Sequence, residues 1–292
     1  MKTIMVATDF SERSDRALRR ATLLARQFGA SIVLVHVVDD DQPQWIVESE
    51  QEAASRLLSE TAATVAEIDG VRCETQLIVA APFAGIELAT RDRVPDLLVI
   101  GAHRRQVLRD IFIGTTAERI IRSVSCPVLM VNAPPVGPYR TVLLTTDLSD
   151  GSRSAMQRFV ALGIRGPART AVLHVFEAPG FGLAASPAMR KDDKDRYLAK
   201  ERDEAALKLA SILGDYDLES ADQLVRQDAS GAANEILAVA KDAEAELIVI
   251  GTKGKSGLTK LLIGSVAEEV LSKAKMDVLA VPPFKERGTS GE

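Results

Sequence analysis

The chain carries one sequence pattern in both of its halves, and this duplication restricts the fold more than any other feature. The segment Val6–Ser11 (VATDFS) returns as Leu144–Ser149 (LTTDLS), 138 residues later. The segment Asp96–Gly101 (DLLVIG) returns as Glu246–Gly251 (ELIVIG), 150 residues later. Solenoid repeats have periods of roughly 20–50 residues, so a period this long indicates a duplicated domain. A chain of 292 residues accommodates two such domains, each with its own core.

The bulk composition argues against nucleic-acid and membrane partners. The net charge is -5 and aromatic residues make up only 4% of the chain, so neither an electrostatic footprint nor stacking platforms for nucleic acid are expected. The chain begins directly with an apolar strand, which leaves no room for a signal peptide. No apolar run reaches the roughly 18 residues that indicate a membrane span. Cys73 and Cys126 lack counterparts in the second half, which predicts buried free thiols in a cytoplasmic protein.

Each half alternates short apolar runs with longer amphipathic ones, which predicts two α/β domains with right-handed crossovers. The short runs are rich in Val, Ile and Leu without strict alternation, as is typical of parallel strands buried on both faces. The predicted strands are Thr3–Thr8, Ser31–Val37, Cys73–Val79, Leu97–Gly101, Val128–Val131, Thr141–Thr146, Thr170–Phe176, Ala221–Arg226, Leu247–Gly251 and Val278–Val281. The predicted helices include Ser14–Phe28, Glu48–Ile68, Ala117–Arg122, Ser152–Leu162, Asp192–Leu213, Ala233–Ala243 and Val266–Ala274.

Proline and glycine mark the boundaries. Residues 133–138 (APPVGP) contain three prolines and predict a stiff linker between a domain at 1–132 and a domain at 139–284. The polar residues 285–292 predict a frayed tail. The additional residues of the second half fall in Glu177–Arg190, a Gly- and Pro-containing loop after the second strand. This loop is either a lid over the ligand-binding edge of the sheet or an ordinary surface insertion.

The stretch Gly251–Ser265 (GTKGKSGLTKLLIGS) carries the clearest chemical signal. Glycine at the end of a buried strand permits close backbone approach, and the amides that open the following helix form an anion site. Three lysines add positive charge: Lys253, Lys255 and Lys260. The stretch therefore predicts a polyphosphate site. It is not a Walker A loop, because position 249, where the first glycine would stand, is Val249. The chain also contains no GxGxxG motif.

The spacing G-x2-G-x9-G-[S/T] in a strand–loop–helix setting resembles the universal stress protein family, here with two such domains in tandem. The resemblance covers nearly the whole chain: a Thr-Asp pair ends strand one, a His-Val pair ends strand two, and the glycine loop follows strand four. It implies that each domain is a five-strand parallel sheet in the order 3-2-1-4-5 with helices on both faces. Strands one and four are then neighbours, so Asp147 and Gly251 face one crevice.

The resemblance also implies how the domains assemble. The two halves are expected to pack as two family subunits do, with the last strands, Val128–Val131 and Val278–Val281, at the contact, because those apolar strands would otherwise be exposed edges. A further homodimer of the tandem chain and a protein partner of unknown identity stay open.

Nucleotide-binding members of the family hold ATP in the crevice. The strand-one aspartate meets the nucleoside, the valine backbone meets adenine, and the glycine loop takes the ribose and phosphates. The resemblance implies binding residues in the second half at Thr146, Asp147, Val175, Gly251, Gly254, Gly264, Ser265 and Val266, and in the first half at Thr8, Asp9, Val37, Gly101, Gly114 and Thr115.

The first half departs from this motif at its middle glycine, where Arg104 stands. A side chain there obstructs close backbone approach, although Arg104, Arg105 and Arg109 offer an alternative grip on phosphate. We therefore expect ATP, with or without Mg²⁺, mainly in the C-terminal domain.

Some of the same residues also have plain structural interpretations. Asp9 and Asp147 could simply start turns or help to cap helices, and His36 and His174 are predicted to be hydrogen-bonded structural residues. We recognise no metal-ligand set, no general base beside the phosphates and no carboxylate pair for Mg²⁺. The sequence thus predicts an ATP-binding regulatory or stress-response protein without catalytic residues. The alternatives are slow ATP hydrolysis, nucleotidyl or phosphoryl transfer, or an interaction scaffold with vestigial sites.

Overall fold

The computed structural model describes residues 1–102, 116–164, 168–178, 190–216, 218–253 and 263–283. Most of the insertion at Glu177–Arg190 lies outside the described residues, so its interpretation as a lid or a surface loop stays a prediction. The predicted tail at 285–292 also lies outside them. None of the described helices is long and apolar enough to cross a membrane.

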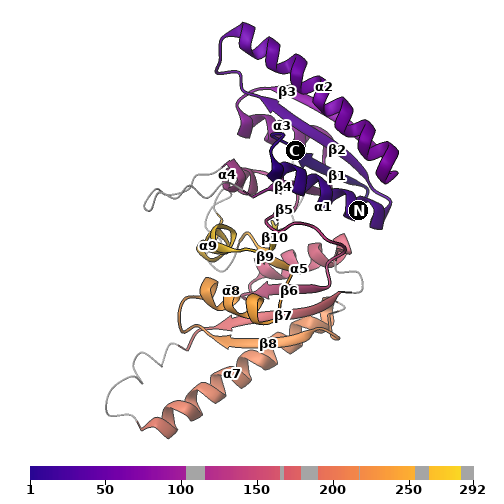
Figure 1. Ribbon diagram of the computed structural model, residues 1–292. Helices are drawn as coiled ribbons and strands as arrows, with labels where there is room; N and C mark the ends of the chain where they lie inside the picture. Colours follow the sequence, from indigo (N-terminus) through magenta and orange to yellow (C-terminus); the bar gives the residue numbers. More distant parts are fainter. Residues whose placement is uncertain (103–115, 165–167, 179–189, 217, 254–262, 284–292) are drawn as a thin grey trace, which may run out of the picture.

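The described strands form one ten-stranded sheet that runs through both halves, in the order β3-β2-β1-β4-β5-β10-β9-β6-β7-β8 (Figure 1). Each half thus has the strand order 3-2-1-4-5, which confirms the predicted topology. The N-terminal half contains β1 (Thr3–Ala7), α1 (Glu12–Phe28), β2 (Ser31–Val38), α2 (Gln44–Asp69), β3 (Cys73–Val79), α3 (Pro82–Arg93), β4 (Leu97–Gly101), α4 (Thr116–Ser123) and β5 (Val128–Val131). Helix α3 was not among the predicted helices.

The C-terminal half repeats this plan. It contains β6 (Thr141–Thr146), α5 (Asp150–Leu162), β7 (Arg169–Phe176), α7 (Lys191–Leu213), the 3-10 helix η1 (Gly214–Tyr216), β8 (Asp222–Gln227), α8 (Ala232–Asp242), β9 (Leu247–Gly251), α9 (Ser265–Lys273) and β10 (Asp277–Val281). All ten strands begin and end within one residue of the predicted bounds, because buried parallel strands read as short continuous apolar runs.

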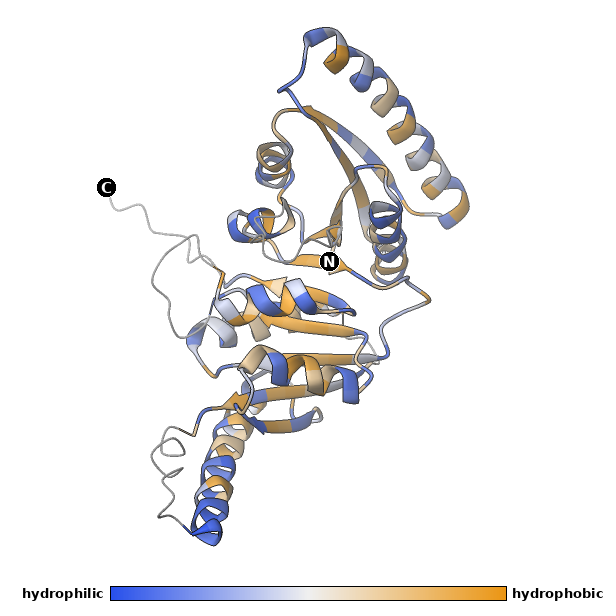
Figure 2. Ribbon diagram, turned by 60° about the vertical axis from the view of Figure 1, so that its left-hand side comes forward, coloured by the Kyte–Doolittle hydropathy of each residue, from blue (hydrophilic) through white to orange (hydrophobic). Residues whose placement is uncertain are grey.

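Helices cover both faces of the sheet and enclose two apolar cores. Side chains alternate between the faces, so Ile4 and Val6 join one core and Met5 joins the other. Helices α1, α2, α5 and α7 contribute to the first core, and α3, α4, α8 and α9 to the second. Figure 2 shows hydrophobic strands inside and hydrophilic residues on the outer faces of α2 and α7.

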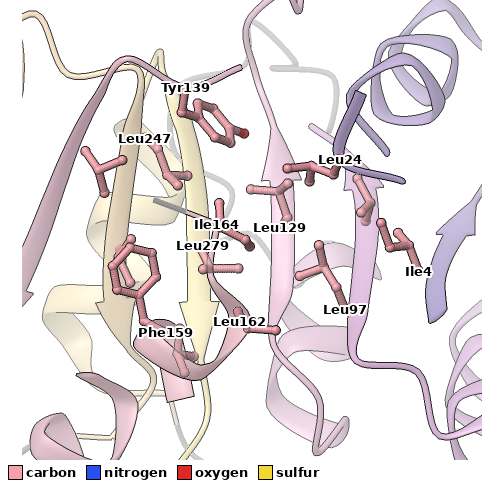
Figure 3. Close-up of a cluster of buried hydrophobic side chains, with 14 of the residues drawn as sticks. Ile4, Leu24, Leu97, Leu129, Tyr139, Phe159, Leu162, Ile164, Leu247 and Leu279 are labelled. Atoms are coloured by element: carbon pink, nitrogen blue, oxygen red, sulfur yellow. The ribbon is translucent and has the colours of Figure 1, made fainter. Parts of the chain in front are cut away.

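The two halves join through their last strands, as predicted. Strand β5 pairs antiparallel with β10, and Leu129 lies opposite Leu279. The first core continues across this junction, and Figure 3 shows members from both halves side by side: Leu24, Leu97, Leu129, Phe159, Leu247 and Leu279. Pairing these strands satisfies backbone groups that a separate domain would expose at a sheet edge.

Equivalent arginines of α1 and α5 bind backbone carbonyl oxygens near the junction. Arg20 Nη1 donates to the Gly137 carbonyl oxygen at 2.7 Å. Arg158, its counterpart 138 residues later, donates to the carbonyl oxygens of Pro282 at 2.7 Å and Ser125 at 2.9 Å. The bond between Arg158 and Ser125 joins the two halves directly, and the bond between Arg20 and Gly137 fixes the linker to α1. Polar contacts therefore hold the domain pair together with the sheet.

The two cysteines are free. Cys126 is buried as predicted, whereas Cys73, on the edge strand β3, is only partly buried, which corrects the prediction for this residue. An edge strand lacks a neighbour on one side and leaves part of its side chains near solvent. Burial raises the pKa of both thiols to about 11.

Candidate functional site

A tight turn places Asp147 at the carboxyl end of β6. Thr146 Oγ1 accepts the Leu148 amide at 3.0 Å, and Leu148 adopts a left-handed conformation with φ of 64°. Asp147 Oδ1 accepts both the amide of Ser149 at 3.0 Å and its hydroxyl at 2.5 Å. The Ser149 hydroxyl in turn caps α5 by accepting the Ser152 amide. Ser149, and not Asp147, therefore caps the helix. Asp147 holds Ser149 in position by two hydrogen bonds and itself lies at the end of β6.

The N-terminal half builds the same turn. Thr8 Oγ1 accepts the Phe10 amide at 3.0 Å, Phe10 has φ of 56°, and the Ser11 hydroxyl donates to Asp9 Oδ1 at 2.5 Å. Asp9 additionally pairs with Arg13, whose Nη2 lies 3.4 Å from Asp9 Oδ2. Burial works to raise the pKa of Asp9, but the hydrogen bonds from Ser11 and Ser14 and the Arg13 charge outweigh it, and the pKa lies below its usual value.

The two strand-end histidines are structural, as predicted. His36 Nδ1 lies 2.8 Å from the Thr8 carbonyl oxygen, and His174 Nδ1 lies 2.9 Å from the Thr146 carbonyl oxygen. A carbonyl oxygen only accepts, so Nδ1 carries the proton in both rings. Each histidine therefore locks the end of the second strand of its half to the end of the first.

The described ends of the C-terminal glycine loop meet beside this turn. The Gly264 amide donates to the Thr252 carbonyl oxygen at 3.0 Å, which joins the end of β9 to the start of α9. Gly264 caps α9 without a side-chain hydrogen bond. The amides of the first helical turn have no acceptor within the helix, so Ser265 and its neighbours present donors at the positive end of the helix dipole.

These elements enclose a cavity of about 260 Å³ in the C-terminal half. It brings together seven of the eight predicted residues: Thr146, Asp147, Val175, Gly251, Gly264, Ser265 and Val266. The eighth, Gly254, lies outside the described residues. The volume is close to the lower end of small-molecule pockets, about 300 Å³.

The other lining residues of the cavity are Thr145, Ser152, Leu173, Ala232, Ile236, Ile250, Lys253 and Ala267. Lys253 was predicted to add positive charge to the polyphosphate site, and the other seven were not predicted as site residues. Most of them form an apolar wall opposite the polar strand ends. Ala232 and Ile236 are separated by one helical turn of α8, and this spacing was the available signal for a shared helix face. The sequence did not show that this face borders the motif.

In the N-terminal half, the described candidates lie at the equivalent strand ends. Thr8 and Asp9 follow β1, Val37 is near the end of β2, and Gly101 ends β4. The remaining candidates, Gly114 and Thr115, lie outside the described residues, as do Arg104, Arg105 and Arg109.

Comparison with known proteins identifies the family. The model of the universal stress protein family (Usp) matches residues 1–132 and again 138–282. The chain therefore belongs to the universal stress protein family and contains two copies of its domain.

Individual relatives agree with this assignment. A universal stress protein of Mycolicibacterium smegmatis is 24% identical over 296 residues, which cover 96% of this chain and 97% of the relative. One from Methanocaldococcus jannaschii is 31% identical over 141 residues, 46% of this chain and 83% of the relative. The crystal structure of a universal stress protein from Archaeoglobus fulgidus, 17% identical, covers 97% of both chains with a TM-score of 0.70 and supports the shared fold.

Proposed function

We propose that this protein binds ATP in the cavity of its C-terminal domain and acts as a cytoplasmic regulatory or stress-response protein. The observation that carries the proposal is the convergence of the predicted strand ends, the glycine-loop ends and the start of α9 on one cavity with an apolar wall. Pockets of this kind combine an apolar lining with a few convergent polar groups.

The lining residues suit the parts of a nucleotide. Leu173, Val175 and Ile236 offer an apolar surface for a purine base, and Asp147 offers a carboxylate for ribose hydroxyls. The first amides of α9, the Ser265 hydroxyl and the Lys253 ammonium favour phosphate. Among the described residues no group of three or more His, Cys, Asp or Glu side chains is placed to hold a metal ion. Mg²⁺ keeps several waters and commonly binds through substrate phosphates, and the proposal places it at the phosphates of ATP.

We further propose that the protein does not turn ATP over. Among the described lining residues the carboxylate is that of Asp147, and the proposal places this carboxylate at the ribose and not beside the phosphates. A general base needs a free position within hydrogen-bond reach of the attacking water. Steady-state release of phosphate, with and without Mg²⁺, tests this part of the proposal. Sustained phosphate release that disappears in Asp147→Ala would contradict this part of the proposal and indicate that the protein hydrolyses ATP slowly.

The matched pair Asp147→Ala and Asp9→Ala tests the binding site. Both substitutions remove an aspartate from the same turn, so their effects on folding are comparable. Loss of a charged hydrogen bond to the ligand costs about 1.5–3 kcal/mol, so Asp147→Ala is expected to weaken ATP binding by about 10- to 100-fold. Asp9→Ala is expected to leave affinity within a factor of two. Calorimetric titration with ATP, ADP and cAMP measures both, and equal losses in the two variants would contradict the site.

A further inference from the structure

The junction between the two halves has equivalent positions on its two sides. In the antiparallel pair of β5 and β10, Leu129 lies opposite Leu279, its own counterpart 150 residues later. The neighbouring pair, Val278 opposite Met130, follows the same register. An approximate twofold axis through the two leucines therefore exchanges the halves, and each contact on one side of the axis can be compared with its counterpart on the other side.

On one side of the axis, a buried carboxylate of the C-terminal half binds donors that the N-terminal half supplies. Asp277 Oδ1 accepts the amides of Asn132 and Ala133 at 2.9 and 3.1 Å. Asp277 Oδ2 lies 3.2 Å from Arg20 Nε, and both of these side chains are buried. The N-terminal half thus contributes a cation and two amides that follow its last strand, and the C-terminal half contributes the negative charge between them.

On the other side of the axis, prolines stand at the positions of the carboxylate and of the two amides. Pro127 is the counterpart of Asp277, and Pro282 and Pro283 are the counterparts of residues 132 and 133. Proline carries no charge and no amide proton. This side of the junction therefore neither supplies a carboxylate nor presents the two amides that would bind one.

The arginine on the proline side binds acceptors of another kind. Arg158, the counterpart of Arg20, donates to the Pro282 carbonyl oxygen at 2.7 Å and to the Ser125 carbonyl oxygen at 2.9 Å. These acceptors are neutral backbone groups, whereas the acceptor beside Arg20 is a buried carboxylate. The two sides of the junction are thus equivalent in backbone geometry and different in chemistry.

A pair of two N-terminal halves would lack the carboxylate on both sides of the axis. Arg20 of each half would meet Pro127 of the other half, and the amides of Asn132 and Ala133 would lose their acceptor. An interface that buries a charge without its partner is weakened by about 100-fold or more. Such a pair would contain this defect twice.

A pair of two C-terminal halves would have the opposite defect. Asp277 of each half would meet Pro282 and Pro283 of the other half, which have no amide to donate. Even with Arg158 opposite, Asp277 Oδ1 would lose both of the hydrogen bonds that it accepts. Each hydrogen bond to a charged group strengthens an interface by about 10- to 100-fold, so this pair is also disfavoured.

We infer that the junction is selective for unlike halves: it pairs an N-terminal half with a C-terminal half and rejects a second copy of either. The determinants are Asp277 on one half, and Arg20 with the amides of Asn132 and Ala133 on the other. The inference goes beyond the proposed function and does not depend on nucleotide binding. It reserves the surface of the last strands for the partner half, so a homodimer of the chain has to use a different surface.

Pairing after cleavage of the linker tests the selectivity without the covalent connection. A protease recognition sequence is inserted between Pro135 and the exposed Val136, which keeps the contacts at Ala133 and Gly137. The folded chain is cleaved, unfolded in urea together with an isotope-labelled copy, and refolded with both halves present. Native mass spectrometry then identifies the pairs by mass. We expect unlike pairs, mixed in label, to exceed like pairs at least tenfold. Like pairs as abundant as unlike pairs, or halves that refold without pairing, would overturn the inference.

Pro127→Asp tests the determinants in a variant that is expected to stay folded. In the native pairing Arg158 lies beside this segment, where it donates to the Ser125 carbonyl oxygen, so the new carboxylate has a cation nearby. In the cleaved protein the same carboxylate supplies the acceptor that two N-terminal halves lack, and we expect their pairs to increase at least tenfold. Pro134→Asp, at an exposed linker position, is the matched control and should pair as the wild type does. The melting temperature establishes that each variant is folded, and a folded Pro127→Asp variant without the increase would show that the carboxylate does not select the partner.

Discussion

Replacement of Asp277 by alanine is expected to lower the free energy of unfolding by about 3–5 kcal/mol, because it leaves a buried charge without its partner. Asp277 is fully buried at the start of β10. Its Oδ1 accepts the amides of Asn132 and Ala133 at 2.9 and 3.1 Å. Its Oδ2 accepts the Tyr139 hydroxyl at 2.6 Å and lies 3.2 Å from Arg20 Nε. One carboxylate thus connects α1, the linker region and the C-terminal sheet.

The surroundings of Asp277 explain the size of the expected effect. Arg20 is itself only 5% exposed, and its guanidinium lies 4.0 Å from the centre of the Tyr139 ring. Burial, and then the charge of Asp277, hold the pKa of Tyr139 well above its ordinary value, so the phenol stays neutral and donates. Without the carboxylate, a buried cation loses its counter-charge and a buried hydroxyl loses its acceptor.

Urea denaturation followed by circular dichroism measures the loss. Tyr139→Phe is the matched control, since it removes one donor and keeps the carboxylate, and it is expected to cost about 1–2 kcal/mol. A loss below 1 kcal/mol for Asp277→Ala would show that this network does not hold the two domains together.

Ser265→Glu is expected to weaken ATP binding by about 100-fold while leaving the fold intact. A glutamate in the first turn of α9 interacts favourably with the helix dipole, so helix stability is maintained or raised. The same carboxylate lies where the proposal places phosphate, and like charges in close contact cost several kcal/mol, of which about 2.8 kcal/mol corresponds to 100-fold. Binding and helix stability therefore change in opposite directions.

Adenosine provides the control for this prediction. It lacks phosphate, so its affinity should be nearly the same for Ser265→Glu and the wild type, whereas ATP loses most of its affinity. Fluorescence competition or calorimetry measures both ligands. Equal losses for adenosine and ATP would place the phosphates elsewhere, and an unchanged ATP affinity would remove α9 from the site.

The sequence predicts the fold of this chain well because its signals are local. Apolar runs such as Leu247–Gly251 mark buried strands. Serine is a residue that commonly caps helices, and Ser11 and Ser149, which follow the first strand of each half, cap α1 and α5. The strand order followed from the family resemblance. Helix α3 was missed because its apolar residues do not form a clean stripe: Ile86 is buried, whereas Leu88 is 46% exposed.

The residues of the candidate site that belong to the motif could be predicted from the sequence. The residues that reach the site through the packing of a helix could not. Thr146, Asp147 and Gly251 stand at strand ends, whose positions follow from the topology. Ile236 reaches the cavity from α8, and its place depends on how that helix docks. Gly85 packs against Val37, 48 positions earlier in the chain, so closely that a Cβ would lie 2.6 Å from a methyl carbon of that valine. No local pattern reports a contact of that kind.

The proposed function requires that one chain hold one nucleotide, in its C-terminal domain. The most direct measurement is to saturate the purified protein with ATP and Mg²⁺, remove free nucleotide, denature the protein and count the released nucleotide by chromatography and mass spectrometry. We expect about one ATP per chain, retained in Asp9→Ala and lost in Ser265→Glu and Gly254→Arg. Two nucleotides per chain, or none, would contradict it.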